Sequence, residues 1–453
     1  MNKAPCDIGS QQQNLLNRAK QHLDSAEKRG LNVATSAFCY LNAWSPCPGN
    51  ALLRWWRFGL TSLGGLIYQY LKAVVLIARQ SNYCIINDSP EPISASNMIV
   101  SWARQSDLLP DGSFQDRYLG ANSKDYASIM WVVILLDGQP PAHVNSNVRV
   151  LGRSKGVPRF DIVFFLKFFI QKIRESKGSL RSFFYSFSAA TAYAEEIAAI
   201  IGAKIRGARF DTLLMPYEAQ PFQHAVYLAA KTHNKAIRTI GYMHSVLPPL
   251  PTDLLYRMGT PDMLWIHGRA QAEILSAKLG WPESTLRIIP SLRYKCNDKA
   301  PFSRQIFFPY SFHDPNRLVA GFRALLSKAA PGSLPLFEIR NHPLMSNSAS
   351  HMQLDARFKA LIAHYCECFV NDCPSGDVSI FVGATAAIIE AMERGVNPIQ
   401  ICSDPVFEAH TEQIWNCLEV TQLDSMLFKY RLRARGSCIQ LGGEEDSLRR
   451  YLA

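Results

Sequence analysis

Ionisable side chains follow two apolar runs in the first half of the sequence. Glu218 comes shortly after the run FDTLLM, and His244 comes shortly after IRTIGY. A half-buried carboxylate there would have a raised pKa and could accept a proton or attack a carbon, and an imidazole could act as a base or bind phosphate. The alternatives are a helix-start acid and an ordinary loop histidine. Asp111, in the acidic loop SDLLPDGSFQDRY, is a third candidate, and we predict a catalytic role for all three.

The second half of the sequence places basic and hydroxyl side chains after similar runs. A guanidinium and an imidazole occur in EIRNHPL, and both groups suit a phosphate or a base. In SIFVGATAAIIEAMERGVNPIQI a strand, a turn and a helix follow each other, and helix N-termini bind phosphate. A surface turn and an ordinary βαβ unit are the alternative interpretations. The predicted nucleotide-binding residues are Tyr310, Ser311, Arg340, His342, Thr385 and Glu390.

The sequence predicts no metal site and no resident cofactor. His364, Cys366, Cys368 and Cys373 lie close together, but they lack the second, separated pair that zinc sites usually have. The spacing of the acidic loop does not fit calcium either. The 11 cysteines are scattered and no signal peptide precedes them, so we expect free thiols and a cytoplasmic location.

Apolar runs of strand length alternate with helical patterns along the chain, which predicts βαβ units and parallel sheets. We therefore expect an α/β fold of two Rossmann-like domains that face a central cleft. Ligands of such sheets bind beyond the carboxyl ends of the strands, where the candidate residues fall. The proline-rich segment VLPPLP is interpreted as the connection between the domains. The predicted divisions are a polar leader (1–50), an acceptor-side domain (51–246), a nucleotide-sugar-binding domain (247–430) and a basic tail (431–453).

The net charge of +11 and pI near 9.1 indicate an anionic partner. No nucleic-acid-binding motif accompanies the basic residues, so we expect a phosphate-bearing substrate and an anionic lipid surface rather than nucleic acid. The segment from Trp55 to Ala78 is apolar but is interrupted by Arg57 and Lys72. It is either a buried helix or an interfacial helix on the inner face of the cytoplasmic membrane.

The second-half motifs resemble the donor domain of GT-B glycosyltransferases that use cytidine nucleotides, such as sialic acid, Kdo and glycerol-phosphate transferases. The resemblance covers residues 95 to 405, and its matching residues are His342, Pro343, Thr385, Glu390 and Gly395. The strand end GYMHS is similar to the Q-H-G strand end of that family. The stretches SWARQSDLLPDGSFQDRY and YEAQPF resemble surface-carbohydrate biosynthesis proteins. The turn GATAA has one hydroxyl where many relatives have two, which leaves the donor open.

This resemblance implies a glycosyltransferase that works without a bound metal. The donor would be a nucleotide sugar, with Kdo or another CMP-activated acidic sugar favoured. The acceptor would be a surface polysaccharide such as capsule, O-antigen or lipopolysaccharide, or a lipid-linked glycan. The alternatives are a polyol-phosphate transferase or a sugar-nucleotide epimerase on the same fold, and a non-catalytic assembly protein docked on the membrane.

Overall fold

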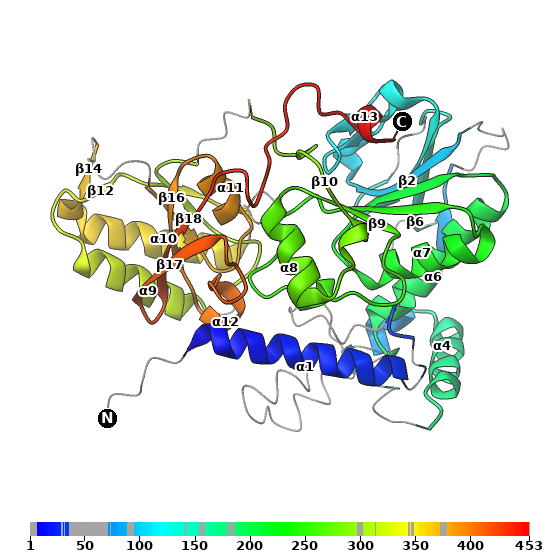
Figure 1. The fold of residues 1–453 in the computed structure, drawn as a ribbon, viewed down its shortest axis with the longest axis horizontal. Helices are drawn as coiled ribbons and strands as arrows, with labels where there is room; N and C mark the ends of the chain where they lie inside the picture. The colour runs from blue at the N-terminus through cyan, green and yellow to red at the C-terminus, as the bar shows by residue number, and fades with distance from the viewer. Residues whose placement is uncertain are drawn as a thin grey trace.

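The computed structural model describes most of the chain. The described residues are 7–28, 30, 32–35, 71–72, 74–87, 95–139, 141, 143–153, 159–178, 183, 186–296, 302–312, 314–342, 345, 348–371 and 378–452. They form a mixed α/β structure with two large sheets (Figure 1). The helices are α1 (Ile8–Lys28), α4 (Ile162–Glu175), α6 (Ala189–Arg206), α7 (Pro221–His233), α8 (Arg269–Leu279), α9 (Pro315–Lys328), α10 (Ala349–His364), α11 (Ala387–Glu393), α12 (Pro405–Glu408) and α13 (Leu448–Leu452).

The first sheet has eight strands. Their spatial order is β1 (Tyr83–Ile85), β6 (Val148–Arg153), β5 (Ile129–Leu135), β2 (Asn97–Ala103), β7 (Thr212–Pro216), β8 (Arg238–Tyr242), β9 (Met263–Ile266) and β10 (Leu286–Ile288). All neighbours are parallel except β1, which runs antiparallel to β6. The continuous apolar sequence of β5 is buried along almost its whole length, as expected for a parallel strand covered on both faces.

The second sheet has six strands. Their order is β13 (Glu338–Arg340), β11 (Gln305–Phe307), β15 (Val378–Val382), β16 (Asn397–Ile401), β18 (Leu427–Leu432) and β17 (Leu418–Asp424). The first four strands are parallel, and β18 and β17 add an antiparallel hairpin at one edge. Two small ribbons pair β12 (Leu334–Pro335) with β14 (Phe369–Val370) and β3 (Gln115–Asp116) with β4 (Ala121–Asn122). The predicted α/β class with parallel strands is therefore confirmed.

The division between the sheets does not coincide with the predicted boundary at residue 246. Strand β9 pairs with β8, and β10 pairs with β9, so the first sheet continues to Ile288. The proline-rich segment lies inside the structure, where Leu247 and Leu250 are buried and the Trp415 indole donates a hydrogen bond to the carbonyl of Pro249. Proline makes this segment stiff, but a stiff loop can connect neighbouring strands as well as domains.

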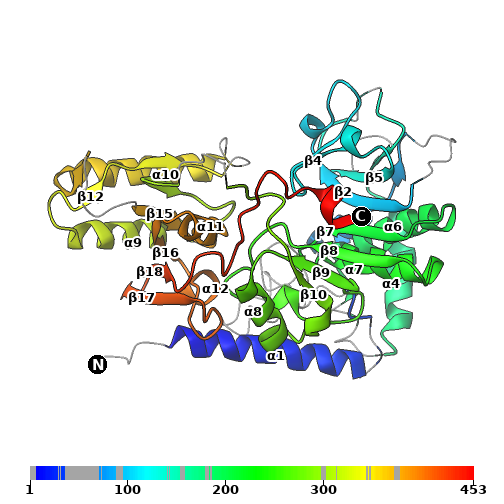
Figure 2. The same cartoon turned by 45° about the horizontal axis from the view of Figure 1, so that its top comes forward.

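Both ends of the described chain pack against the body. Residues 8–28 were expected in a polar leader, but they form α1, whose Leu16, Ala19 and Leu23 are buried. The last residues were expected to be a basic tail, but α13 returns to the first sheet, where Tyr451 lies 6.0 Å from the ring of Trp265. Figures 1 and 2 show α1 running along both halves of the molecule and the chain ending beside the first sheet. Both segments carry apolar residues at helical spacing, which allows one face of each helix to pack against the rest of the protein.

Helix α1 connects the two halves through side-chain hydrogen bonds. The amide of Gln12 donates to the carbonyls of Val406 and Ala409, beside α12, at 3.0 and 2.7 Å. Near the other end of α1, the Glu27 carboxylate accepts a bond from the backbone of Met258, at 3.4 Å. The helix therefore contacts segments that belong to both sheets.

Most of the segment from Trp55 to Ala78, interpreted as either a buried or an interfacial helix, lies outside the described residues. At its end, Ile77 and Ala78 are fully buried, and Ile77 packs with Phe168 of α4. Among the described residues, no helix combines the length and the hydropathy that a membrane crossing requires.

Candidate functional site

Each sheet contains a point at which the strand order reverses. In the first sheet the chain runs from β2 to β5 and β6 on one side, and then crosses to β7 on the other side of β2. In the second sheet it runs from β11 to β13, and then crosses to β15. Ligands of open parallel sheets bind at the carboxyl ends of the strands beside such a reversal. The topology therefore selects the residues that follow β2, β7 and β8, and those that follow β11, β13 and β15.

Glu218 and His244 form a hydrogen-bonded pair at the reversal in the first sheet. Nε2 of His244 lies 3.1 Å from one carboxylate oxygen of Glu218, and the amide of Gln220 donates to the other at 2.7 Å. The imidazole is 2% exposed and the carboxylate 40% exposed. Nδ1 of His244 is buried without a hydrogen-bond partner among the described residues. The carboxylate thus faces outward, with the imidazole behind it.

The pKa of Glu218 departs from the expected direction. Desolvation alone would raise the pKa of the carboxyl, as the sequence suggested. The hydrogen bond and charge of His244, the bond from Gln220 and the charge of Arg293 outweigh desolvation and lower this pKa below its ordinary value. The expectation of a raised pKa was wrong because it considered burial without these partners. Glu218 is consequently ionised at neutral pH.

The turn that carries Glu218 is held in an uncommon backbone conformation. Ala219, the next residue, has a φ of 55°, which lies in the left-handed region that side chains other than glycine rarely adopt. Buried Arg257 donates a hydrogen bond to the carbonyl of Ala219 at 3.2 Å. The side chain of Gln223 on α7 accepts bonds from the backbone of Glu218 and Gln220, at 3.1 and 2.9 Å. Such strain persists where surrounding contacts enforce it, and it is frequent at functional sites.

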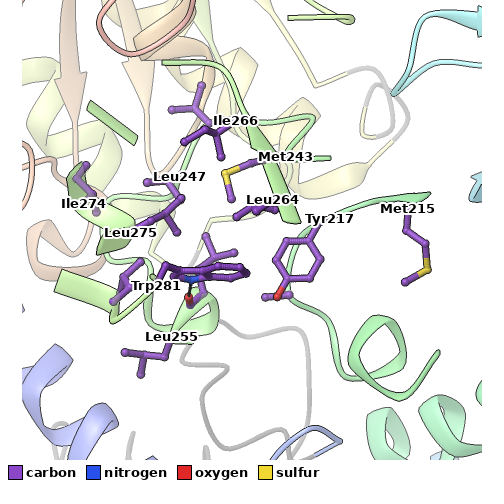
Figure 3. Close-up of a cluster of buried hydrophobic side chains, with 14 of the residues drawn as sticks. Met215, Tyr217, Met243, Leu247, Leu255, Leu264, Ile266, Ile274, Leu275 and Trp281 are labelled. Carbon is purple, nitrogen blue, oxygen red and sulfur yellow. Dashed lines mark hydrogen bonds between the residues drawn. The ribbon is translucent and has the colours of Figure 1, made fainter. Parts of the chain in front are cut away.

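The chain segments below Glu218 and His244 are anchored in the core. Tyr217 and Met243 immediately precede the two residues, and both lie in the apolar cluster drawn in Figure 3. The backbone of Tyr217 also donates a hydrogen bond to the carbonyl of Tyr242. Packing on these two residues therefore fixes the start of each functional loop.

Aromatic side chains from β2 and the following loop surround the imidazole. The ring of Tyr118 lies 4.5 Å from that of His244, and the ring of Trp102 lies 6.3 Å from it. Burial, together with the charges of Glu218 and Asp116, raises the pKa of Tyr118 to about 12. The phenol is therefore protonated at neutral pH and can donate a hydrogen bond.

Asp116 is a second carboxylate close to His244. It is fully buried, and its Oδ1 accepts hydrogen bonds from the backbone of Tyr118 and Leu119 at 2.7 and 2.9 Å. Desolvation raises its pKa, although the Ser101 hydroxyl, these backbone bonds and the charge of His244 act in the opposite direction. Asp116 therefore holds the backbone of the loop and lies within electrostatic range of the imidazole.

Asp111 is not brought together with this group. Its carboxylate accepts hydrogen bonds from the backbone and hydroxyl of Ser113 and lies 3.5 Å from Lys124. The adjacent Gly112 accepts a hydrogen bond from Asn145, which precedes β6. Asp111 therefore lies toward the amino ends of the strands, whereas Glu218 follows a carboxyl end. Its predicted catalytic role has no support in this geometry, because the loop turns back along the sheet.

In the second sheet, Tyr310 and His342 lie together beyond β11 and β13. Their ring centroids are 5.3 Å apart with the planes nearly perpendicular. Desolvation lowers the pKa of His342, and His351, Arg104 and Arg293 lower it further. Because those two arginines follow strands of the first sheet, groups from both sheets act on one imidazole. The two sets of strand ends therefore lie within electrostatic range of each other.

The other predicted nucleotide-binding residues lie near the same strand ends. Arg340 is exposed, and its guanidinium lies 5.6 Å above the ring of Phe307 on the neighbouring strand. Ser311 is exposed in the loop beyond β11. The side chain of Arg340 therefore lies against Phe307, the last residue of the neighbouring strand, rather than beyond the strand ends.

Thr385 and Glu390 have structural partners. The hydroxyl of Thr385 accepts a hydrogen bond from the backbone of Ala387 at 3.3 Å, and α11 begins at Ala387 rather than at Thr385. Glu390 pairs with Arg394 at 3.0 Å. Gly395, with a φ of 87°, follows the helix. Because α11 has only seven residues, its N-terminus is not by itself a phosphate site.

No group of three histidine, cysteine or acidic side chains in the described part of the chain is arranged to hold a metal ion. Cys373 and Pro343, which the sequence analysis named, lie outside the described residues.

Five residues described at the site were not among the predicted site residues: Trp102, Arg104, Asp116, Tyr118 and Arg293. Trp102 lies within β2, one residue before its end, and Asp116 and Tyr118 belong to the acidic loop from which Asp111 was chosen instead. Arg293 follows β10, and it was missed because that strand was assigned to the other domain. The strand-end rule that selected Glu218 would have found Arg104, which directly follows β2, whereas the burial of Asp116 has no local signal.

Comparisons with known proteins give little further information. No family model matches the chain, and no curated protein sequence matches it significantly. Among solved structures, a glycosyltransferase from Rickettsia africae ESF-5 is similar with a TM-score of 0.32 and 11% identity, over 69% of this chain and 86% of that one. The strand topology and the side-chain geometry therefore define the site.

Proposed function

We propose that this protein is a glycosyltransferase of the GT-B arrangement, which moves a sugar from a nucleotide donor to a glycan or lipid-linked glycan. One observation carries the proposal. An ionised, accessible carboxylate at the strand reversal of one sheet lies in a group of side chains that extends through Arg293 to His342 of the other sheet. A base beside a cationic group is what transfer from a phosphate leaving group requires.

In this proposal Glu218 takes the proton of the acceptor hydroxyl. The acceptor oxygen forms a bond to the anomeric carbon of the sugar, and the bond from that carbon to the donor phosphate breaks. His244 orients the carboxylate through the 3.1 Å hydrogen bond, and Tyr118 can donate a hydrogen bond to a substrate oxygen. The lowered pKa keeps Glu218 ionised before the acceptor binds.

The leaving nucleotide would bind beside the second sheet. Arg104 and Arg293 place positive charge close to His342, which supports binding of a phosphate there. Fixed cationic donors would stabilise the phosphate as its charge develops. The rings of Tyr310 and His342 offer a surface for the base. A CMP-activated acidic sugar is the first donor to test, because the second-sheet motifs resemble those of cytidine-dependent transferases.

The test is a thermal-shift screen of the full chain against cytidine, uridine and guanosine nucleotides and their sugars, followed by a product assay with the best ligand. A nucleotide that binds the native state raises the unfolding temperature. We expect stabilisation, and then a new glycosidic bond in the product. A phosphodiester product would instead identify a polyol-phosphate transferase. If none of the nucleotides raises the unfolding temperature, the proposal of a nucleotide-dependent enzyme is rejected.

A further inference from the structure

Helix α4 presents an apolar face to the solvent. Five aliphatic side chains on it are about half exposed, at 47–57%: Ile162, Val163, Leu166, Ile170 and Ile173. Apart from the adjacent pair Ile162 and Val163, they are spaced three or four residues apart, which places them on one side of the helix. Phe160, directly before the helix, is 55% exposed and extends this surface. Single exposed apolar residues are ordinary, but a continuous helical face marks an interaction site.

The opposite face of α4 is firmly attached to the protein. Phe168 packs with Ile77, Phe187 and Ala192 in a separate buried cluster. Lys172 is buried on this face and pairs with Glu175, at 2.7 Å, and with Glu195 of α6. The helix is therefore held in one orientation, and its apolar face is presented outward by the fold.

The charges along the exposed face are mostly positive. Lys167 and Arg174 are exposed and lie seven residues apart, which is two helical turns, so they share one edge of the apolar face. Arg159 and Lys177 are exposed near the two ends of the helix. The nearest acids have local partners, because Asp161 caps the helix by accepting a bond from Phe164 and Glu175 pairs with Lys172.

We propose that α4 docks this protein on the surface of an anionic lipid bilayer. The aliphatic face would enter the boundary between headgroups and acyl chains, and the basic edge would contact anionic headgroups. A second copy of the chain fits less well, because a symmetric pairing of this face would bring the like charges of Lys167 and Arg174 together. The inference does not depend on the reaction that the site performs.

The experiment is sedimentation of the full chain with phosphatidylcholine vesicles, with and without phosphatidylglycerol. We expect binding to the anionic vesicles that weakens as salt is raised. The double variant Leu166→Gln/Ile170→Gln should bind at least about tenfold more weakly, because two apolar anchors are lost. Lys167→Gln/Arg174→Gln should lose about thirtyfold, and only on anionic vesicles, since each of the two charges near the surface contributes about 1 kcal/mol.

The matched control is Met352→Gln, which alters a 53% exposed apolar side chain on α10. It should sediment like the wild type. Thermal unfolding of every variant checks folding, and little change is expected because the altered side chains are half exposed. The proposal is overturned if the wild type does not bind anionic vesicles or if the double apolar variant binds equally well. It is also overturned if that variant abolishes a concentration-dependent dimer, since the face would then be a contact between copies.

Discussion

Replacement of Glu218 by glutamine separates catalysis from folding most directly. The carboxylate accepts one hydrogen bond from His244 and one from Gln220, at 3.1 and 2.7 Å. Glutamine has one acceptor oxygen, so one of these charge-assisted bonds, each worth about 1.5–3 kcal/mol, is lost. Because the side chain is 40% exposed, water replaces part of that loss, and we expect about 1 kcal/mol of destabilisation. The unfolding temperature should therefore fall by only about 1 °C, because the entropy of unfolding scales with the length of this 453-residue chain.

Turnover should fall much further. General acid–base catalysis contributes roughly 10²–10⁴-fold, which corresponds to about 2.7–5.4 kcal/mol in the activation barrier. A loss of this size exceeds the expected change in stability, so misfolding cannot account for it. Nucleotide binding should be unchanged, because the proposed nucleotide site lies beside the second sheet. The assays are product formation at saturating donor, thermal unfolding, and nucleotide-induced stabilisation.

Two control variants make this prediction specific. Glu218→Asp keeps the charge but withdraws it from the site, and should retain more turnover than Glu218→Gln. Glu283→Gln alters an exposed glutamate before β10 and should leave turnover unchanged. Near-normal turnover in Glu218→Gln would refute the proposed base. If Asp111→Asn then abolished turnover, the catalytic role would belong to the acidic loop after all.

Three further predictions concern the neighbouring groups. His244→Ala removes interactions that lower the pKa of Glu218, so the acidic limb of the pH profile of kcat/KM should move to higher pH; an unchanged limb would contradict the pairing. His342→Ala should weaken nucleotide binding about tenfold, and more than Arg340→Ala. The pKa of His342 is lowered in the free protein, and a bound phosphate would raise it. Nucleotide binding to the wild type near pH 6.5 should therefore be accompanied by uptake of a proton, which calorimetry in buffers of different ionisation enthalpy measures. His342→Ala should show no such uptake. Ala219→Gly should stabilise the fold by about 0.5–1 kcal/mol in denaturant unfolding, since glycine relieves the strain of the positive φ. It should also reduce turnover, because glycine loosens the turn that carries Glu218. A loss of stability would argue against backbone strain at this position.

The strands were predictable because a strand buried on both faces appears in the sequence as a continuous run of apolar residues. The apolar run at 128–136 became β5 with bounds differing by one residue at each end. The boundary between the sheets was not predictable in the same way, because a proline-rich loop has the same sequence character between strands and between domains. The pairing of β9 with β8 is a long-range contact with no local signature.

The candidate site was predictable to the extent that it depends on strand ends. Parallel strands bring their carboxyl ends to one edge, and this rule correctly placed Glu218 beside His244. It could not choose among the acids of one loop, because the burial of Asp116 depends on packing against distant strands. The direction of the pKa shift at Glu218 likewise depends on partners whose distances are known only after folding.

The attachment of α1 has a consequence for the order of events during synthesis. The carbonyls that bind Gln12 lie 394 and 397 residues further along the chain. At about 5–20 residues per second, the ribosome makes them roughly 20–80 s after α1. Throughout that interval Gln12 and the part of α1 that packs against α12 lack their final partners. An early-made helix therefore docks among the last, and newly made chains are exposed to aggregation or to capture by chaperones until residues beyond Ala409 have emerged.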